Sequence, residues 1–384
     1  MFTKVWQEVK FPFFTFLVWR IFLILVAFIS PAFFQLQDNF LGGGKETYQQ
    51  NPLFWGHLNF DGEHYLSIAQ RGYRDLEYFY FPPYPLLIGY IAKLLNGQIV
   101  MYAAVGLIIS HIAFFLALTG LYKLIKLDFK ENVAMWSLTG LLIFPTSFYF
   151  ASFYTESLFL MVVIWSFYFA RKGKWFLTGM LGAFLSATRL VGIVLLPSLI
   201  IEYIKQKRGL KIVSYKSLFL FLTPLGIVTY IIYLNKATND PLEFLHTVEI
   251  FGSQRSSALV LLPQVFYRYL LKILPNLDYS YISVVFTTLL EFSVVLIFLA
   301  LSVLAFFRLR HSYAVYTSLA FIIPTLSGSF SSMPRYVLVL FPAYIMIGIW
   351  LLKKGRLVKV IYFLLNLTLL IISESLFFRG FWVS

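Results

Sequence analysis

The chain has 384 residues, of which 60% are hydrophobic, 20% aromatic and only 12% charged. Water-soluble domains are roughly 45–50% apolar and about 25% charged, so this composition excludes an ordinary soluble globule. The net charge of +14 could suggest a nucleic-acid-binding protein, but Lys and Arg cluster in short loops between apolar segments, which indicates membrane topology instead. The chain has no cysteine, which excludes disulfides and thiolate metal sites.

Apolar runs of about 20 residues and a mean hydropathy of +0.79 predict an all-α polytopic membrane protein. The first run is long and no small-residue cleavage site follows it, so we interpret it as a retained helix. The run 82–95 is too short to cross the hydrocarbon core and is expected to be re-entrant or interfacial. The predicted apolar segments are 12–34, 99–122, 133–150, 155–170, 175–203, 216–234, 281–307, 312–327, 336–352 and 357–376.

The distribution of basic residues divides the loops between the two sides of the membrane. Short loops on one side hold Lys4, Lys10, Lys123, Lys126, Lys130, Arg171, Lys172, Lys174, Lys205, Lys207, Arg208, Lys211, Lys216, Arg308, Arg310, Lys353, Lys354, Arg356 and Lys359. The long loops 35–81 and 235–280 and most acidic residues fall on the other side. Basic loops stay in the cytoplasm, so this pattern places the long loops on the extracytoplasmic face.

Segment 175–203 begins and ends beside basic clusters that this scheme places in the cytoplasm. A single long tilted span would break the charge pattern of everything downstream. We therefore expect two short half-spans that form a hairpin, with Arg189 at its tip, deep in the membrane or at its outer edge.

The first long loop holds the strongest candidate for chemistry, Asp61. The spacing of the residues after it predicts a helix, and from spacing alone an N-cap role for Asp61 is favoured. An ionised carboxylate that faces a polar substrate could instead act as a general base. Glu63 and His64 are adjacent candidates for an auxiliary proton or metal role, although such residues are more often solvated.

Three further charged residues lie beside or within apolar runs. Arg189 has no charged residue within ten positions on either side, and an unpaired Arg near mid-bilayer would cost at least ~2.5–3.5 kcal/mol. It needs an anion, either Glu156 or a substrate phosphate. Arg335 could clamp a phosphate or snorkel at the interface, and Glu156 could face a cavity or cap the helix after Thr155.

The aromatic-proline run from Phe79 to Pro85, FYFPPYP, is expected to be extended because of its three prolines. Its aromatic rings could line a prenyl chain, stack on a sugar or simply form an interfacial belt. No GxGxxG, Walker A, HExxH or GxSxG element occurs in a usable context, so a nucleotide-driven mechanism has no support.

These pieces, in this order, resemble the PIG-V type mannosyltransferase family, membrane glycosyltransferases of the GT-C class. The first family motif is matched by Asp61, His64, Tyr65, Leu66, Ile68, Ala69, Gly72 and Tyr73, and the next by Phe81, Pro82, Tyr84, Pro85 and Leu86. Later motifs are matched by Pro145, Ser147, Tyr154, Thr155, Glu156 and Ser157, by Ser186 to Arg189, and by Arg335, Tyr336, Leu338, Phe341 and Pro342. Phe60 stands where the family usually has Trp.

The resemblance implies a GT-C-like bundle of about 10–12 transmembrane helices. It also implies an outward-facing site that uses a polyprenyl- or dolichyl-phosphate sugar, with Asp61 as the base. We expect one integral membrane domain over 1–384, with loop 35–81 catalytic and 235–280 as the second outer loop. The expected substrate-binding residues are His64, Tyr84, Glu156, Arg189, Arg335 and Tyr336.

The favoured function is an inverting transfer of a hexose, mannose by resemblance, to a lipid-linked or glycan acceptor. We expect no cofactor, no supported metal requirement and no nucleic-acid partner. The location would be the plasma (inner) membrane of a prokaryote, or the endoplasmic reticulum membrane of a eukaryote. The rival functions are a transporter or flippase of a polar lipid and a non-catalytic partner in a membrane complex.

Overall fold

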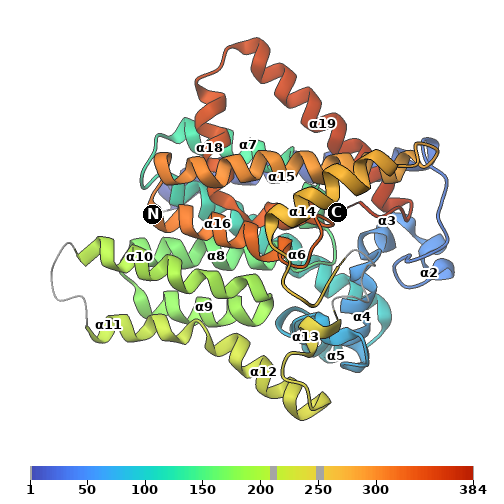
Figure 1. The fold of residues 1–384 in the computed structure, drawn as a ribbon, viewed down its shortest axis with the longest axis horizontal. Coiled ribbons are helices and arrows are strands. Elements are labelled where there is room, and N and C mark those ends of the chain that lie inside the picture. Colours follow the sequence, from blue (N-terminus) through green and yellow to red (C-terminus); the bar gives the residue numbers. More distant parts are fainter. Residues whose placement is uncertain (1, 208–213, 248–254, 384) are drawn as a thin grey trace.

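The computed structural model describes residues 2–207, 214–247 and 255–383, and within these ranges every regular element is a helix (Figure 1). The longer helices are α1 (Phe2–Ile29), α5 (Pro83–Leu95), α6 (Ile99–Ile125), α7 (Glu131–Leu142), α8 (Glu156–Arg171), α9 (Trp175–Thr188), α10 (Leu195–Lys207), α12 (Leu225–Thr238), α15 (Ile282–Arg308), α16 (His311–Thr325), α18 (Phe341–Leu352) and α19 (Arg356–Phe378). The elements of the first long loop are α2 (Lys45–Gln50), α3 (Pro52–Trp55), η2 (Gly56–Leu58), α4 (Asp61–Arg71) and η3 (Glu77–Phe79). The remaining short helices are η1 (Ser30–Ala32), η4 (Ser147–Ala151), η5 (Leu190–Val194), α11 (Tyr215–Leu218), η6 (Phe219–Leu222), α13 (Glu243–His246), α14 (Leu262–Arg268), the π-helix η8 (Tyr269–Ile273), η9 (Leu274–Asn276), α17 (Met333–Tyr336) and η10 (Val337–Val339).

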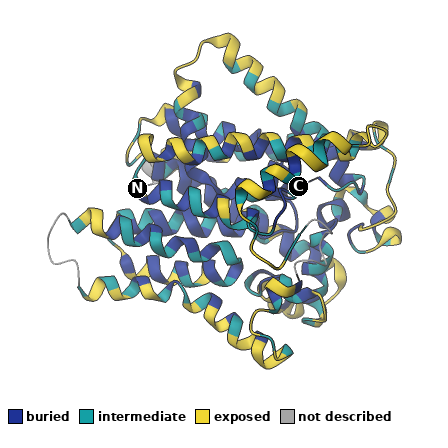
Figure 2. Cartoon of the chain, viewed as in Figure 1, coloured by how far each residue is buried: buried dark blue, intermediate teal, exposed yellow. Residues whose placement is uncertain are grey.

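Within the described residues, five helical segments are long and apolar enough to cross a membrane: Trp6–Ala32, Ile99–Ile125, Tyr215–Thr238, Ile282–Arg308 and Arg356–Phe378. A sixth span is formed if Met333–Val339 and Phe341–Leu352, which meet at an 84° bend, are counted together. Shorter helices pack between these spans: α8 lies against α6 and α9, α18 against α7, and α16 against α10. Apolar residues remain exposed on α12, α15 and α19, as expected for surfaces in lipid (Figure 2).

The basic loops gather at one end of the bundle, as the charge pattern predicts. Arg171 at the end of α8 pairs with Asp128, and Arg310 before α16 donates to the buried carboxylate of Glu202 at 2.8 Å. Lys123 pairs with Glu8 of α1 at 3.1 Å. Arg208 and Lys211, assigned to the same side, lie outside the described residues.

The predicted hairpin over 175–203 is confirmed. The rings of Trp175 and Tyr203, at its two ends, lie 4.9 Å apart, and Gln206 donates to the carbonyl oxygen of Ala170 at 3.0 Å. The chain reverses after Arg189, whose backbone is extended. Arg189 therefore lies at the tip of the hairpin, away from the basic clusters at the ends of its two arms.

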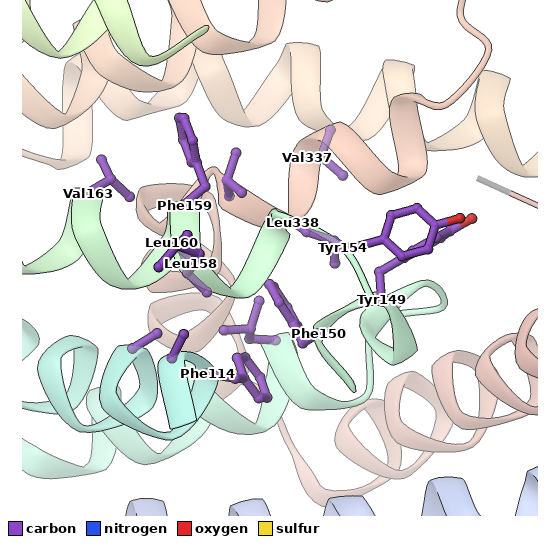
Figure 3. Packing of buried hydrophobic residues seen from close by; sticks show 14 of the residues in the cluster. Phe114, Tyr149, Phe150, Tyr154, Leu158, Phe159, Leu160, Val163, Val337 and Leu338 are labelled. Carbon is purple, nitrogen blue, oxygen red and sulfur yellow. The ribbon is translucent and has the colours of Figure 1, made fainter. Parts of the chain in front are cut away.

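A core of aromatic rings holds the segment between α7 and α8 against α6 (Figure 3). Phe150 stacks on Phe114 with ring centroids 4.2 Å apart and planes at 11°, a geometry worth about 0.5–1.5 kcal/mol beyond area burial. Gly106 permits the close approach of Phe153, because a Cβ there would lie 2.1 Å from the ring. This packing fixes the corner that begins α8 at Glu156.

The expectation of an extended FYFPPYP run was wrong in its second half. Tyr80 has an extended backbone, but α5 begins at Pro83 and includes Pro85. Proline is tolerated in the first turn of a helix, because the N–H groups of that turn have no intrahelical partner. Helix α5 has 13 residues, too few to span the hydrocarbon core.

Single cysteines can test this topology, because the chain has none of its own. Lys45, Lys172 and Lys236 are exposed, with Lys172 at the end that carries the basic loops. We expect an impermeant thiol reagent to label intact cells that carry Lys45→Cys or Lys236→Cys, but not Lys172→Cys. Labelling of position 172 alone would invert the assignment of the two faces.

Candidate active site

Asp61 is the first residue of α4 and points away from that helix. The N-cap residue is Phe60, and no side chain caps the helix, so the N-cap interpretation of Asp61 was wrong. Phe60 has φ of 60°, a strained conformation for a residue other than glycine. Its ring is held by those of Phe40 and Trp382, at 6.0 and 5.0 Å. This packing fixes the direction of the Asp61 side chain.

The Asp61 carboxylate pairs with the side chains of Arg335 and Tyr80. Oδ2 forms an ion pair with Arg335, and Oδ1 accepts a hydrogen bond from the Tyr80 hydroxyl at 3.2 Å. Burial alone would raise the pKa of Asp61, but the Arg335 guanidinium outweighs this and holds that pKa below its ordinary value. Asp61 is therefore ionised at neutral pH.

Arg335 lies in the short helix α17, just before the 84° bend that leads into α18. Its side chain is only 6% exposed, so the snorkelling interpretation was wrong. The guanidinium carbon lies 5.4–5.8 Å from the ring centroids of Tyr149, Tyr154, Tyr336 and Trp382. Such aromatic faces attract a cation, so they stabilise the buried guanidinium of Arg335.

Glu156 contacts both Arg189 and Arg335. Its Oε1 lies 2.8 Å from Nη1 of Arg189 and 3.6 Å from Nε of Arg335, while Oε2 has no hydrogen-bond partner among the described residues. The ring of Tyr336 lies between the arginines, at 5.2 Å from Arg189 and 5.4 Å from Arg335. Glu156 does not cap α8, because its carboxylate is committed to these cations.

The other two predicted substrate-binding residues, His64 and Tyr84, lie in different environments. His64 stacks on Tyr80, with ring centroids 4.9 Å apart, and lines a cavity beside Asp61. Tyr84 is fully buried, and its hydroxyl contacts Gly106 O at 3.1 Å and Ser110 Oγ at 2.8 Å. In the described structure Tyr84 lines neither cavity at the site, so its predicted contact with substrate does not fit its position.

Two cavities meet at Asp61, and we name them by their linings. The apolar cavity, of about 390 Å³, runs between α8, the Arg189 tip and α16. Its wall contains Arg189, Arg335 and Glu156 among residues that are mostly apolar, including Phe81, Phe159, Leu190, Val191, Phe244, Ile323, Leu326 and Val339. The second cavity, of about 840 Å³, also touches Asp61 and reaches α15 and the segment after α19; its wall is mostly apolar too, but it carries more polar side chains, and we call it the polar cavity.

Sequence reasoning missed several residues of these walls. Tyr80, Arg255 and Arg335 line both cavities together with Asp61. Arg255 donates to Ser332 Oγ at 3.1 Å, and nothing in the sequence of its long loop marks it. Glu291 lines the polar cavity, and a carboxylate within the apolar run 281–307 was a signal that could have found it.

Among the described residues, no group of three or more His, Asp or Glu side chains is placed to hold a metal ion. The wall of the apolar cavity presents two carboxylates, Asp61 and Glu156, against three guanidinium groups, Arg189, Arg255 and Arg335. Such an arrangement can bind an anion beside an ionised carboxylate.

Among solved structures, the crystal structure of ArnT from Cupriavidus metallidurans bound to undecaprenyl phosphate is similar to this chain. The TM-score is 0.52 at 16% sequence identity, and the match covers 90% of this chain. This chain spans 61% of the length of the ArnT chain. The likeness shows the fold, and the GT-C-like membrane bundle predicted from the sequence is confirmed.

The sequence model of the mannosyltransferase (PIG-V) family matches residues 45–222, which include Asp61, Glu156 and Arg189. The resemblance predicted from the sequence is confirmed over this region of the chain. Arg335 lies outside the matched residues, so its place in the site comes from the structure. No curated protein matches the chain.

Substitution of Arg189 tests whether this residue binds a substrate phosphate or only neutralises Glu156. If Arg189 binds a substrate phosphate, Arg189→Ala should strongly weaken donor binding or turnover, and Arg189→Lys should restore only part, because Lys lacks the planar fork. If Arg189 only neutralises Glu156, the double variant with Glu156→Gln should recover folding and activity relative to either single variant. Normal turnover by a well-folded Arg189→Ala protein would remove Arg189 from the site.

Proposed function

We propose that this protein is an inverting glycosyltransferase that acts on the extracytoplasmic face of the membrane. It transfers a hexose, mannose by its family, from a polyprenyl- or dolichyl-phosphate sugar to a lipid-linked or glycan acceptor. The observation that carries the proposal is the ionised carboxylate of Asp61, paired with Arg335 at the wall of an apolar cavity. The undecaprenyl phosphate bound to ArnT, which has the same fold, supports a lipid-phosphate substrate.

The apolar cavity suits the donor. Its aromatic and aliphatic side chains would contact the first isoprene units, and Arg189 and Arg335 would bind the phosphate. Both arginines already lie within 4 Å of Glu156, so they converge on one place. A cavity with a mostly apolar wall and a few converging charged groups is typical of a ligand site.

Asp61 would accept the proton of an acceptor hydroxyl as the acceptor oxygen attacks the anomeric carbon of the sugar. The bond between that carbon and the phosphate oxygen breaks, and the lipid phosphate leaves with the electron pair. The arginines balance the charge that develops on the phosphate. No second carboxylic acid is required to protonate the leaving group, in contrast to the paired carboxylates of glycosidases.

Through Arg335, binding of the donor would change the strength of Asp61 as a base. While Arg335 is paired with Asp61, it lowers the pKa of this carboxyl group and weakens it as a base. A donor phosphate would compete with Asp61 for the same guanidinium. As Arg335 turns to the phosphate, burial would raise the pKa of Asp61, so the base would strengthen when the donor is in place.

The direct test is incubation of the purified protein with a panel of radiolabelled polyprenyl-phosphate sugars, followed by analysis of the products. We expect one sugar to be transferred and free polyprenyl phosphate to be released in equal amount. Movement of the labelled lipid across a vesicle membrane without loss of the sugar would instead identify a transporter.

A further inference from the structure

The polar cavity carries more polar side chains than the apolar cavity, although they share the wall formed by Asp61, Phe79, Tyr80, Arg255 and Arg335. Amide and hydroxyl side chains dominate the rest of its polar lining, among them Gln37, Asn39, Thr287, Thr288 and Ser331. Aromatic rings, including Tyr269 and Trp382, supply flat apolar surface. Hydroxyl and amide groups beside aromatic rings suit a ligand that has many hydroxyl groups and apolar faces, namely a sugar.

Glu291 is the distinctive residue of this cavity. It lies in the apolar helix α15 and is 6% exposed. Its Oε1 accepts a hydrogen bond from Ser332 N at 3.2 Å, and its Oε2 accepts one from the Tyr269 hydroxyl at 3.4 Å. Within the described residues no Lys, Arg or His forms a salt bridge with it.

A carboxylate in a membrane helix is costly unless it faces a cavity or a partner. Two oxygens offer about four acceptor positions, and two long hydrogen bonds leave the others for a ligand. The remaining positions can form hydrogen bonds with hydroxyl groups. We therefore propose that the polar cavity is the acceptor site, and that Glu291 binds the hydroxyl groups of a sugar headgroup there.

This inference rests on the proposed function, because it places the acceptor in the second of the two cavities that Asp61 lines. An acceptor hydroxyl in the polar cavity could reach the Asp61 carboxylate without crossing the donor phosphate. The shared wall would then keep the two substrates apart except at the reacting atoms.

Photolabelling can test the cavity without any turnover. The probes are an octyl mannoside and an octyl phosphate, each with a diazirine in the alkyl chain, added to the protein in lipid nanodiscs. We expect the mannoside to label peptides of the polar cavity, around Ser283–Glu291 and Gly380–Trp382. The phosphate should label the apolar cavity, around Ala320–Ser327.

Glu291→Gln should weaken mannoside labelling of the polar cavity by about 10- to 100-fold, the usual effect of a hydrogen bond to a charged group. Phosphate labelling of the apolar cavity should not change. Glu374→Gln is the matched control, because Glu374 is a buried carboxylate in helix α19 that lines neither cavity. Thr288→Phe, which fills the polar cavity from its wall, should abolish mannoside labelling even if Glu291→Gln folds poorly.

Mannoside labelling in the apolar cavity, or labelling that Glu291→Gln and Thr288→Phe leave unchanged, would overturn the inference. The outcome is separate from that of the transfer assay. A protein that binds the mannoside through Glu291 but uses no donor from the panel would contradict the proposed function and not the sugar site.

Discussion

Asp61→Asn is expected to lower sugar transfer by roughly 10²- to 10⁴-fold, the usual contribution of a general base. The amide cannot accept the proton at neutral pH, yet its oxygen can still accept the hydrogen bond from Arg335, and its NH2 group can donate to the Tyr80 hydroxyl. Because Asp61 makes no cap bond to α4, the substitution removes no helix cap. Arg335 keeps Glu156 at 3.6 Å and its four aromatic rings, so the melting temperature should fall only slightly.

Glu63→Gln is the matched control, because Glu63 also lies in the first turn of α4 but lines neither cavity. It should retain near-wild-type transfer. Both variants are measured for transfer from a polyprenyl-phosphate sugar and for melting temperature. Near-wild-type transfer by a folded Asp61→Asn protein would remove Asp61 from its catalytic role.

Arg335→Gln is expected to lower transfer by about 10²- to 10³-fold and also to change its pH dependence. With Arg335 present, the pKa of Asp61 lies below its ordinary value of 3.8, so the acid limb of kcat/KM should lie below that pH. Without Arg335, burial raises the pKa of Asp61, the base is protonated at higher pH, and the acid limb should move toward neutrality.

The loss of Arg335 also leaves two buried carboxylates, Asp61 and Glu156, with one fewer cation. Removal of one partner from a buried ion pair typically costs about 3–5 kcal/mol, so Arg335→Lys serves as the variant that retains charge. Arg189→Gln is the control for the pH profile, since Arg189 pairs with Glu156 and not with Asp61. An acid limb that stays in place in Arg335→Gln would show that Arg335 does not control the base.

The end of the molecule that carries the site could be predicted from the sequence, because charge and hydropathy act locally. The basic loops assigned Asp61, Glu156, Arg189 and Arg335 to one side, and the structure brings these four residues into contact. The hairpin at Arg189 followed from the same argument. Apolar periodicity likewise located the helices, although it did not indicate the 84° bend after Arg335.

The sequence could not reveal which side chains face a cavity. Tyr84 and Tyr80 stand in the same aromatic run, yet Tyr84 bonds to α6 in the core while Tyr80 bonds to Asp61. This difference arises because α5 begins at Pro83 and turns its side chains inward. Arg255 and Glu291 lie far from every motif in the sequence and reach the site only through tertiary packing.

Arg189 and Arg335, which lie in the wall of the apolar cavity, have a consequence for the end of each catalytic cycle. A sugar phosphodiester carries one negative charge, but the released lipid phosphate is a monoester with a charge of about −1.5 to −2 at pH 7. Arg189 and Arg335 should therefore hold the product more tightly than the donor that they first bound. We expect free polyprenyl phosphate to be a strong competitive inhibitor, and its dissociation, rather than glycosyl transfer, to limit the steady-state rate.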